Sequence, residues 1–154
     1  MSFVLTIFSA VIIFILSQFI LRLILEPVIE LKKNIGLISY TLLYFHSKLT
    51  NAAADNKISN EIKICSSKLL AAYSSIPFYS YLHKILYLPP YKDLLEASRN
   101  LNLIHAYMLE GHKEYMKSCN LKKPIHFPIE ISKAMDKIGE LLSITTTYQE
   151  KASA

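Results

Sequence analysis

The chain begins with an apolar stretch that has no charged residue over residues 3–21. Nineteen helical residues extend roughly 28 Å, which is about the thickness of the hydrocarbon layer of a bilayer. A cleaved signal peptide normally has positive residues before its apolar core and small residues at a cleavage site after it. No Lys or Arg precedes this stretch, and no small-x-small pattern follows it. The pattern therefore predicts a retained transmembrane anchor over residues 1–25.

Beyond Pro27, apolar residues recur at alternating spacings of three and four, which is typical of one face of a helix. Proline is tolerated in the first turn of a helix and kinks a longer one, so we expect a long helix that leaves the membrane with a bend at Pro27. Ile24 and Leu21 keep the spacing when it is read backwards. The seam could be an intermolecular coiled coil, but flanking apolar residues make it wider than a dimer needs and favour the buried face of a helix in its own bundle. The seam comprises Val28, Leu31, Ile35, Ile38, Leu42, Phe45 and Leu49.

Three more long helices are indicated by apolar residues at helical spacing. The first follows a loop over 50–57 and spans about 58–75, the second starts after Pro90, and the third opens with Pro128 in its first turn. No stretch alternates with period two, so the sequence predicts an all-α protein: the anchor, a bundle of about four helices plus one short aromatic-rich helix over 26–147, and a tail over 148–154. The end of the chain, from Thr145 onward, is expected to fray. The predicted inner faces are Ile58, Ile62, Cys65, Leu69, Ala72 and Ile76; Leu94, Ala97, Leu101, Ile104 and Met108; and Ile131, Met135, Ile138 and Leu142.

An aromatic-rich segment over residues 76–92 interrupts this helical pattern. It contains lysines but no acidic residue, and aliphatic side chains lie between its aromatic ones. Tyrosine and lysine beside aliphatic residues are typical of a segment at a bilayer surface. A short element that caps the bundle core has the same composition, and the flanking prolines favour that interpretation. The membrane-interface candidates are Phe78, Tyr79, Tyr81, Lys84, Tyr87 and Lys92.

Charge predicts the orientation of the anchor. All 17 Lys and Arg lie at or after Arg22, and the positive-inside rule then places the N-terminus outside and the bundle in the cytoplasm. Two cysteines, Cys65 and Cys119, fit a reducing compartment and lack C-x-x-C spacing. The net charge of +5 comes from basic residues interleaved with acidic ones, which suits attraction to anionic lipid and does not indicate a nucleic-acid groove.

The sequence offers little for catalysis. No P-loop, dinucleotide-binding or nucleophile-elbow motif occurs. The carboxylate pairs Asp93/Glu96 and Asp136/Glu140 each lie beside a lysine and are expected to be solvated helix charges. We predict no catalytic, cofactor-binding or metal-ligating residue, and an enzyme is disfavoured. The five histidines have no metal-site spacing, and they are His46, His83, His105, His112 and His126.

Two stretches resemble an uncharacterised family of small bacterial membrane proteins. EPVIELKKNIGLISYTLLYF at 26–45 and IPFY at 76–79 are similar to that family's EPI.E.R..IG juxtamembrane segment after a single span and to its downstream IP.Y element. Residues 101–106 read LNLIHA where the family has LIGLSN. The resemblance implies a single-pass protein of the bacterial inner membrane with no assigned activity. The matching residues are Glu26, Pro27, Glu30, Ile35, Gly36, Ile76, Pro77, Tyr79 and Pro89.

Two classes of function follow as expectations. The first is a membrane-tethered helical interaction or effector module that binds a protein partner or its own copies and acts at the bilayer in a stress or defence response. The second is a small membrane-associated enzyme or lipid-binding protein that uses the segment 76–92.

Overall fold

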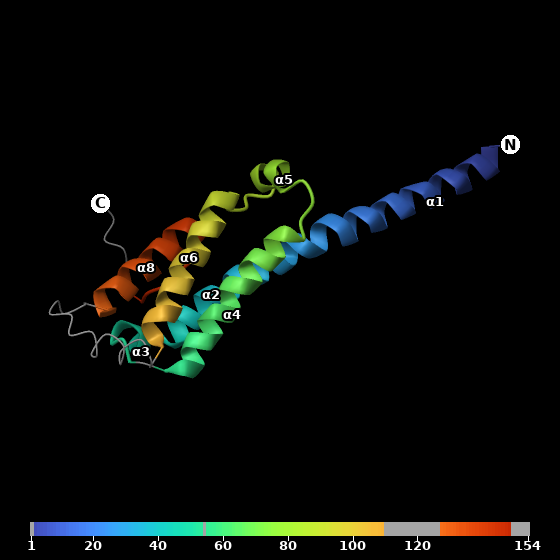
Figure 1. Cartoon of the computed structure of the whole chain (residues 1–154). Coiled ribbons are helices and arrows are strands. Elements are labelled where there is room, and N and C mark those ends of the chain that lie inside the picture. Colours follow the sequence, from blue (N-terminus) through green and yellow to red (C-terminus); the bar gives the residue numbers. More distant parts are fainter. Residues whose placement is uncertain (1, 54, 110–126, 149–154) are drawn as a thin grey trace.

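The computed structural model describes residues 2–53, 55–109 and 127–148, and the regular structure in these ranges is entirely helical. The predicted all-α fold, an apolar N-terminal helix followed by a bundle, is confirmed. Four long helices form the bundle: α2 (Glu26–Tyr44), α4 (Asn56–Ser74), α6 (Tyr91–Met108) and α8 (Phe127–Leu142). Two short helices, α3 (His46–Thr50) and α5 (Tyr79–Ile85), lie at opposite ends of it (Figure 1).

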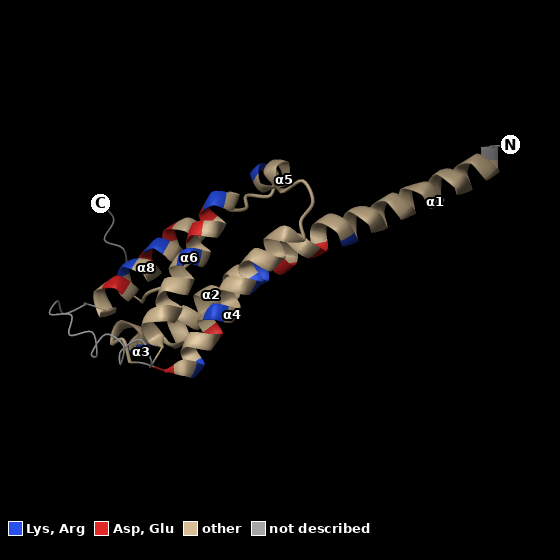
Figure 2. Ribbon diagram, viewed as in Figure 1, with Lys and Arg blue, Asp and Glu red and all other residues tan. Residues whose placement is uncertain are grey.

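The N-terminal helix α1 (Ser2–Ile20) projects away from the bundle, and its main contacts are with the turn that follows it (Figure 1). Its large apolar side chains are bare, with Phe3 77% and Phe14 63% exposed. Figure 2 shows that it carries no charged residue. The helix Phe3–Tyr44, which includes α1 and α2, is the one helix in the described part of the chain that is long and apolar enough to cross a membrane.

A π-helical turn, η1 (Leu21–Leu25), joins α1 to α2 without a break. Pro27 has no backbone N–H, and in an α-helix its ring would press on the carbonyl of Leu23. The wider turn, in which the Glu26 N–H bonds to the Leu21 carbonyl, accommodates the proline inside a continuous helix. η1 has no buried residue, so Leu21 is 42% exposed and the buried seam does not extend back to it as expected.

The core lies where the four long helices meet. Six of the seven seam residues are buried in it, and Phe45 is half-buried where α2 gives way to α3. α4 packs between α2 and α6, and α6 packs between α4 and α8. The predicted inner faces of α4, α6 and α8 are confirmed, because every residue named for them is buried, Cys65 included.

The end of α8 differs from the sequence expectation. Ser143 adopts a left-handed conformation with φ of 53°, and the Ile144 N–H bonds to the Gly139 carbonyl at 3.0 Å, which is the pattern of a Schellman C-cap. The chain then turns back along α2, where the Ser39 hydroxyl donates to the Thr145 carbonyl. Thr146 is 5% exposed. The expected fraying from Thr145 is therefore wrong as far as residue 148, and residues 149–154 lie outside the described ranges.

Gly139 is required by this turn. A Cβ at Gly139 would lie 2.9 Å from Thr146 Oγ1 and 3.1 Å from the Ile144 carbonyl, whereas a Cβ at Gly36 would meet nothing within 4 Å.

Gly36→Ala should stabilise the bundle by about 1 kcal/mol through helix propensity. Gly139→Ala gains the same propensity but overpacks the turn at a cost of about 1–3 kcal/mol. We therefore expect Gly139→Ala to unfold at lower denaturant than Gly36→Ala in micelles. Equal unfolding midpoints for the two variants would show that the turn after α8 does not pack closely against position 139.

Candidate functional site

The segment 76–92 has an inner face that closes one end of the bundle. Tyr79 is 6% exposed, and Ile76 and Leu88 are equally buried. The Tyr79 hydroxyl donates to the Pro89 carbonyl at 2.6 Å. This bond connects the start of α5 to the segment that leads into α6.

Stacked rings join α5 to its neighbours. Tyr73 of α4 makes an edge contact with Tyr79 at 4.8 Å between centroids and stacks on Tyr91 of α6 at 4.7 Å. Tyr79 also stacks on His83 at 5.9 Å. Burial, together with the neighbouring Tyr73, raises the pKa of Tyr79 to about 12. Tyr73 of α4 thus contacts both the inner face of α5 and the start of α6.

The outer face of the same element is apolar and bare. Phe78 is 75% exposed, Tyr81 74%, Ile85 70% and Tyr87 94%. These four side chains, which we call the α5 outer face, project away from the core. Tyr79 therefore belongs to a core cap, whereas Phe78, Tyr81 and Tyr87 are exposed, and their contact with a bilayer stays a prediction.

Backbone strain occurs at both ends of α5. Phe78, at its N-cap, has φ of 53°, and Tyr87, two residues after its last residue, has φ of 51°. The Leu88 N–H bonds to the His83 carbonyl at 2.9 Å, so Tyr87 occupies the position of a helix C-cap where glycine is usual. A bulky residue in this region costs on the order of 1 kcal/mol. Two exposed aromatic residues are therefore held where a glycine would be less strained.

The charges around the α5 outer face are basic. Lys84 on α5 and Lys92 at the start of α6 are exposed, and residues 76–92 contain no acid (Figure 2). Asp93, partly buried in the first turn of α6, is the nearest acidic residue in sequence after them. Among the described residues, Lys84 makes no ion pair.

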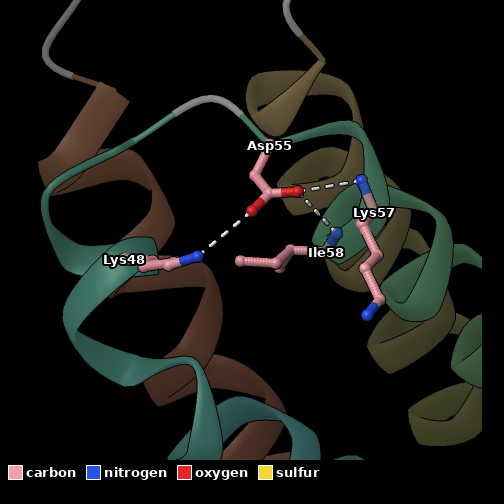
Figure 3. A network of polar contacts seen from close by, with 4 residues as sticks. All are labelled: Lys48, Asp55, Lys57 and Ile58. Atoms are coloured by element: carbon pink, nitrogen blue, oxygen red, sulfur yellow. Dashed lines mark hydrogen bonds and ion pairs between the residues drawn. The ribbon is translucent and has the colours of Figure 1, made fainter.

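An open groove lies at the opposite end of the bundle, where α3 is found. It encloses about 370 Å³. At its edge Asp55 caps α4: it accepts the backbone N–H of Lys57 at 2.9 Å and that of Ile58 at 3.3 Å, and its other oxygen accepts the Lys48 ammonium at 3.2 Å (Figure 3). The Ile58 N–H, then Lys48, hold the pKa of the Asp55 carboxyl below its usual value. The groove is lined by Tyr40, Tyr44, Phe45, Lys48, Asp55, Lys57, Ile58 and Glu61.

One buried serine lies against a histidine, but the pair is built as a link between helices. The Ser59 hydroxyl donates to the His105 carbonyl at 2.8 Å. His105 Nδ1 lies 2.9 Å from the Ser59 carbonyl and 2.7 Å from the Ser59 hydroxyl oxygen. Because the Ser59 hydroxyl proton is directed to the His105 carbonyl, His105 Nδ1 carries a proton and donates it to Ser59. This nitrogen therefore cannot act as a base that activates the Ser59 hydroxyl. The arrangement fastens α4 to α6.

The other candidate groups are dispersed. Within residues 2–53, 55–109 and 127–148, no three metal-ligating side chains come together. Glu96 is paired with Lys137 of α8, whose hydrogen bond and charge lower the pKa of the Glu96 carboxyl. Burial raises the pKa of the Cys65 thiol, and the Thr41 hydroxyl lies 3.6 Å from its sulfur. His112, Cys119 and His126 lie outside the described residues.

Three features were missed at the level of sequence. The N-cap Asp55 was placed in a loop, although Asp before an apolar helical pattern is a standard start signal. The left-handed backbone at Phe78 and Tyr87 has no sequence signal, because neither residue type favours it. Ile29, Tyr40 and Tyr44 on α2 are exposed, and the sequence indicates them only as apolar residues that widen the seam.

Comparison of the chain with protein-family models, with curated proteins and with solved structures finds no match. The site is therefore interpreted from its own geometry.

Tyr79→Phe tests the attachment of α5. Removing the hydroxyl leaves the Pro89 carbonyl without its donor, so we expect a loss of roughly 1 kcal/mol at neutral pH. Because the pKa of Tyr79 is higher in the folded than in the unfolded state, its contribution to the free energy of unfolding is fully present below the ordinary tyrosine pKa near 10. That contribution is lost as the pH rises towards 12. The wild type should therefore lose more stability than Tyr79→Phe between pH 10 and 12, measured by urea unfolding in micelles. Parallel losses in the two proteins would contradict the buried hydroxyl.

Proposed function

We propose that this protein is a membrane-tethered helical interaction module, anchored by α1 in the bacterial inner membrane and self-associating through the outer side of α2. The observation that carries the proposal is the continuity of the helix Phe3–Tyr44, which has bare apolar side chains at one end and forms part of the bundle core at the other. No flexible linker separates the anchor from the bundle. A module built in this way presents its surfaces at a fixed height above the membrane.

The surface best suited to self-association is a stripe on α2 that faces away from the core. At 100° per residue, Ile29, Gly36 and Tyr40 lie nearly opposite the buried Leu31 and Ile38, whereas Tyr44 lies about 130° and Leu37 about 110° from them. The exposed Lys33 lies on the same side. The stripe includes Gly36, where a Cβ would meet nothing within 4 Å. Tyr40 and Tyr44 stack on each other at 5.6 Å and also line the groove near α3. The stripe comprises Ile29 (50% exposed), Gly36, Leu37 (36%), Tyr40 (60%) and Tyr44 (66%).

A second copy of the chain is the occupant we propose for this stripe. The anchor gives every copy the same orientation and depth, so the same five residues meet at the same height. Confinement to the membrane raises the effective concentration of the copies, which favours association through a modest surface. The seam of α2 is already filled by the chain's own helices, so an intermolecular contact has to use another side of the helix.

The proposed topology places the N-terminus outside the cell membrane and the bundle in the cytoplasm. Arg22, Lys32 and Lys33 follow the apolar stretch directly, and no basic residue precedes it. The likeness of the segment around Pro27 and Gly36 to the uncharacterised bacterial family supports the same location.

A reporter that is active only in the cytoplasm tests the topology. Fused after Ala154, it should be active in cells; fused before Met1, it should be silent. The opposite pattern would overturn the orientation. A product shortened by about 20 residues would instead show that the apolar stretch is a cleaved signal.

Oxidative cross-linking in native membranes tests self-association. Tyr40→Cys should form disulfide-linked dimers well above the level of the wild-type chain, whose Cys65 and Cys119 set the background, because two copies of α2 would face each other there. Asp136→Cys is the matched control, since it also places an exposed thiol on a bundle helix but lies outside the stripe. Equal dimer yields for the two variants would contradict an interface at Tyr40.

A further inference from the structure

We propose that the α5 outer face is a second membrane contact: Phe78, Tyr81, Ile85 and Tyr87 enter the interfacial region of the bilayer that α1 crosses. The proposal rests on the anchoring of α1 described above. It adds a specific ligand, the lipid surface, and fixes the side of the bundle that faces it.

The position of α5 makes this contact possible. Figure 1 shows α5 at the end of the bundle from which α1 projects, whereas α3 lies at the far end. The reason is the path of the chain, because α2 leads away from the anchor and α4, antiparallel to it and of the same length, leads back. The turn that follows α4 therefore returns to the level at which the span emerges.

The chemistry of the face suits a bilayer interface. Tyrosine rings place an apolar body in the acyl boundary and a hydroxyl at the headgroups, while Phe78 and Ile85 add purely apolar area. Lys84 and Lys92 carry long apolar stems that let the ammonium groups reach the headgroup layer. The absence of an acid over residues 76–92 matches anionic lipid.

The strained backbone supports a role for these aromatic side chains. Among the described non-glycine residues, only Ala52, Phe78, Tyr87 and Ser143 have positive φ. Ala52 is buried and Ser143 is small, whereas Phe78 and Tyr87 are large, exposed and in the same segment. Neither gains burial within the chain that offsets its conformation. Contact with a bilayer would bury both side chains.

A bilayer explains this face better than a protein partner does. The position of the face next to α1 gives no reason to expect a protein partner there. If α1 spans the bilayer, however, a lipid surface is already present at this end of the bundle. Lys84 makes no ion pair among the described residues, and Tyr81 and Tyr87 are highly exposed. Such side chains can bind lipid headgroups, because a fluid headgroup layer requires no complementary surface shape. Binding to a protein is therefore treated as the competing outcome.

The absence of tryptophan from the chain allows a direct test. The full-length protein is reconstituted in vesicles that contain phosphatidylglycerol and lipids brominated near the carbonyl end of the acyl chains, which quench a nearby indole. Tyr81→Trp and Tyr87→Trp each place a single probe on the α5 outer face. Tyr44→Trp, similarly exposed on α2 near the far end of the bundle, is the control, and Phe8→Trp reports insertion of the span.

We expect strong quenching of the probes at positions 81 and 87, little at position 44, and quenching at position 8 by lipids brominated deeper in the chain. Because Tyr81 and Tyr87 are highly exposed, tryptophan there should leave the helical circular dichroism unchanged. Quenching at position 8 with none at 81 and 87 would overturn the membrane contact, leave the anchor intact, and indicate a protein partner for this face. Absence of quenching at position 8 would overturn the anchor itself.

A charge variant separates lipid attraction from accidental proximity. Lys84→Glu with Lys92→Glu, in the Tyr81→Trp chain, should lose most of the quenching in anionic vesicles. The matched pair Lys57→Glu with Lys63→Glu makes the same change of charge on α4 and should keep it. Equal quenching in the two double variants would contradict the role of the lysines.

Discussion

The rest of the structure depends on a single constraint, the unbroken helix that passes from α1 through the π-helical turn into α2. Pro27 would normally bend or end such a helix, but the wide turn at Leu21–Leu25 accommodates it. One end of the helix has exposed apolar side chains, and the other contributes five buried apolar side chains to the bundle core. The orientation of α1 relative to the bundle is therefore set by a continuous helix.

The return of the chain along α4 follows from this constraint. Because α2 leads away from α1, the end of α4 and the whole of α5 lie back at the end of the bundle near α1, and the groove at Asp55 lies at the far end (Figure 1). The two ends have different chemistry. The end near α1 has exposed aromatic residues with lysines, whereas the far end has an ion pair between Lys48 and Asp55. The outer stripe of α2 runs between them.

Periodicity predicted most of the fold. Every residue that periodicity predicts for the inner faces of α4, α6 and α8 is buried, because each helix buries one face and its apolar residues repeat every three or four positions. The same faces also bury Ala134, Ser59, Ser66 and Ser98, which the apolar pattern does not indicate. The details that failed depend on contacts that no local pattern encodes. The seam stops before the π-helical turn, which has no buried residue, and the packing of Thr146 follows from a C-cap at Ser143, a residue type that gives no such signal. For the candidate site, composition indicated the segment 76–92 but could not separate its buried Tyr79 from its exposed Tyr81, since that depends on the start and direction of α5.

Hydrogen exchange of the full-length protein in lipid bilayers measures the continuity of the helix most directly. If the anchor and the bundle are one helix, the amides of residues 21–30, apart from Pro27, should exchange slowly, with protection close to that of the middle of α2. Exchange there as fast as in the loop around Asn51 would reveal a flexible linker. That result would contradict the rigid coupling of the bundle to the membrane.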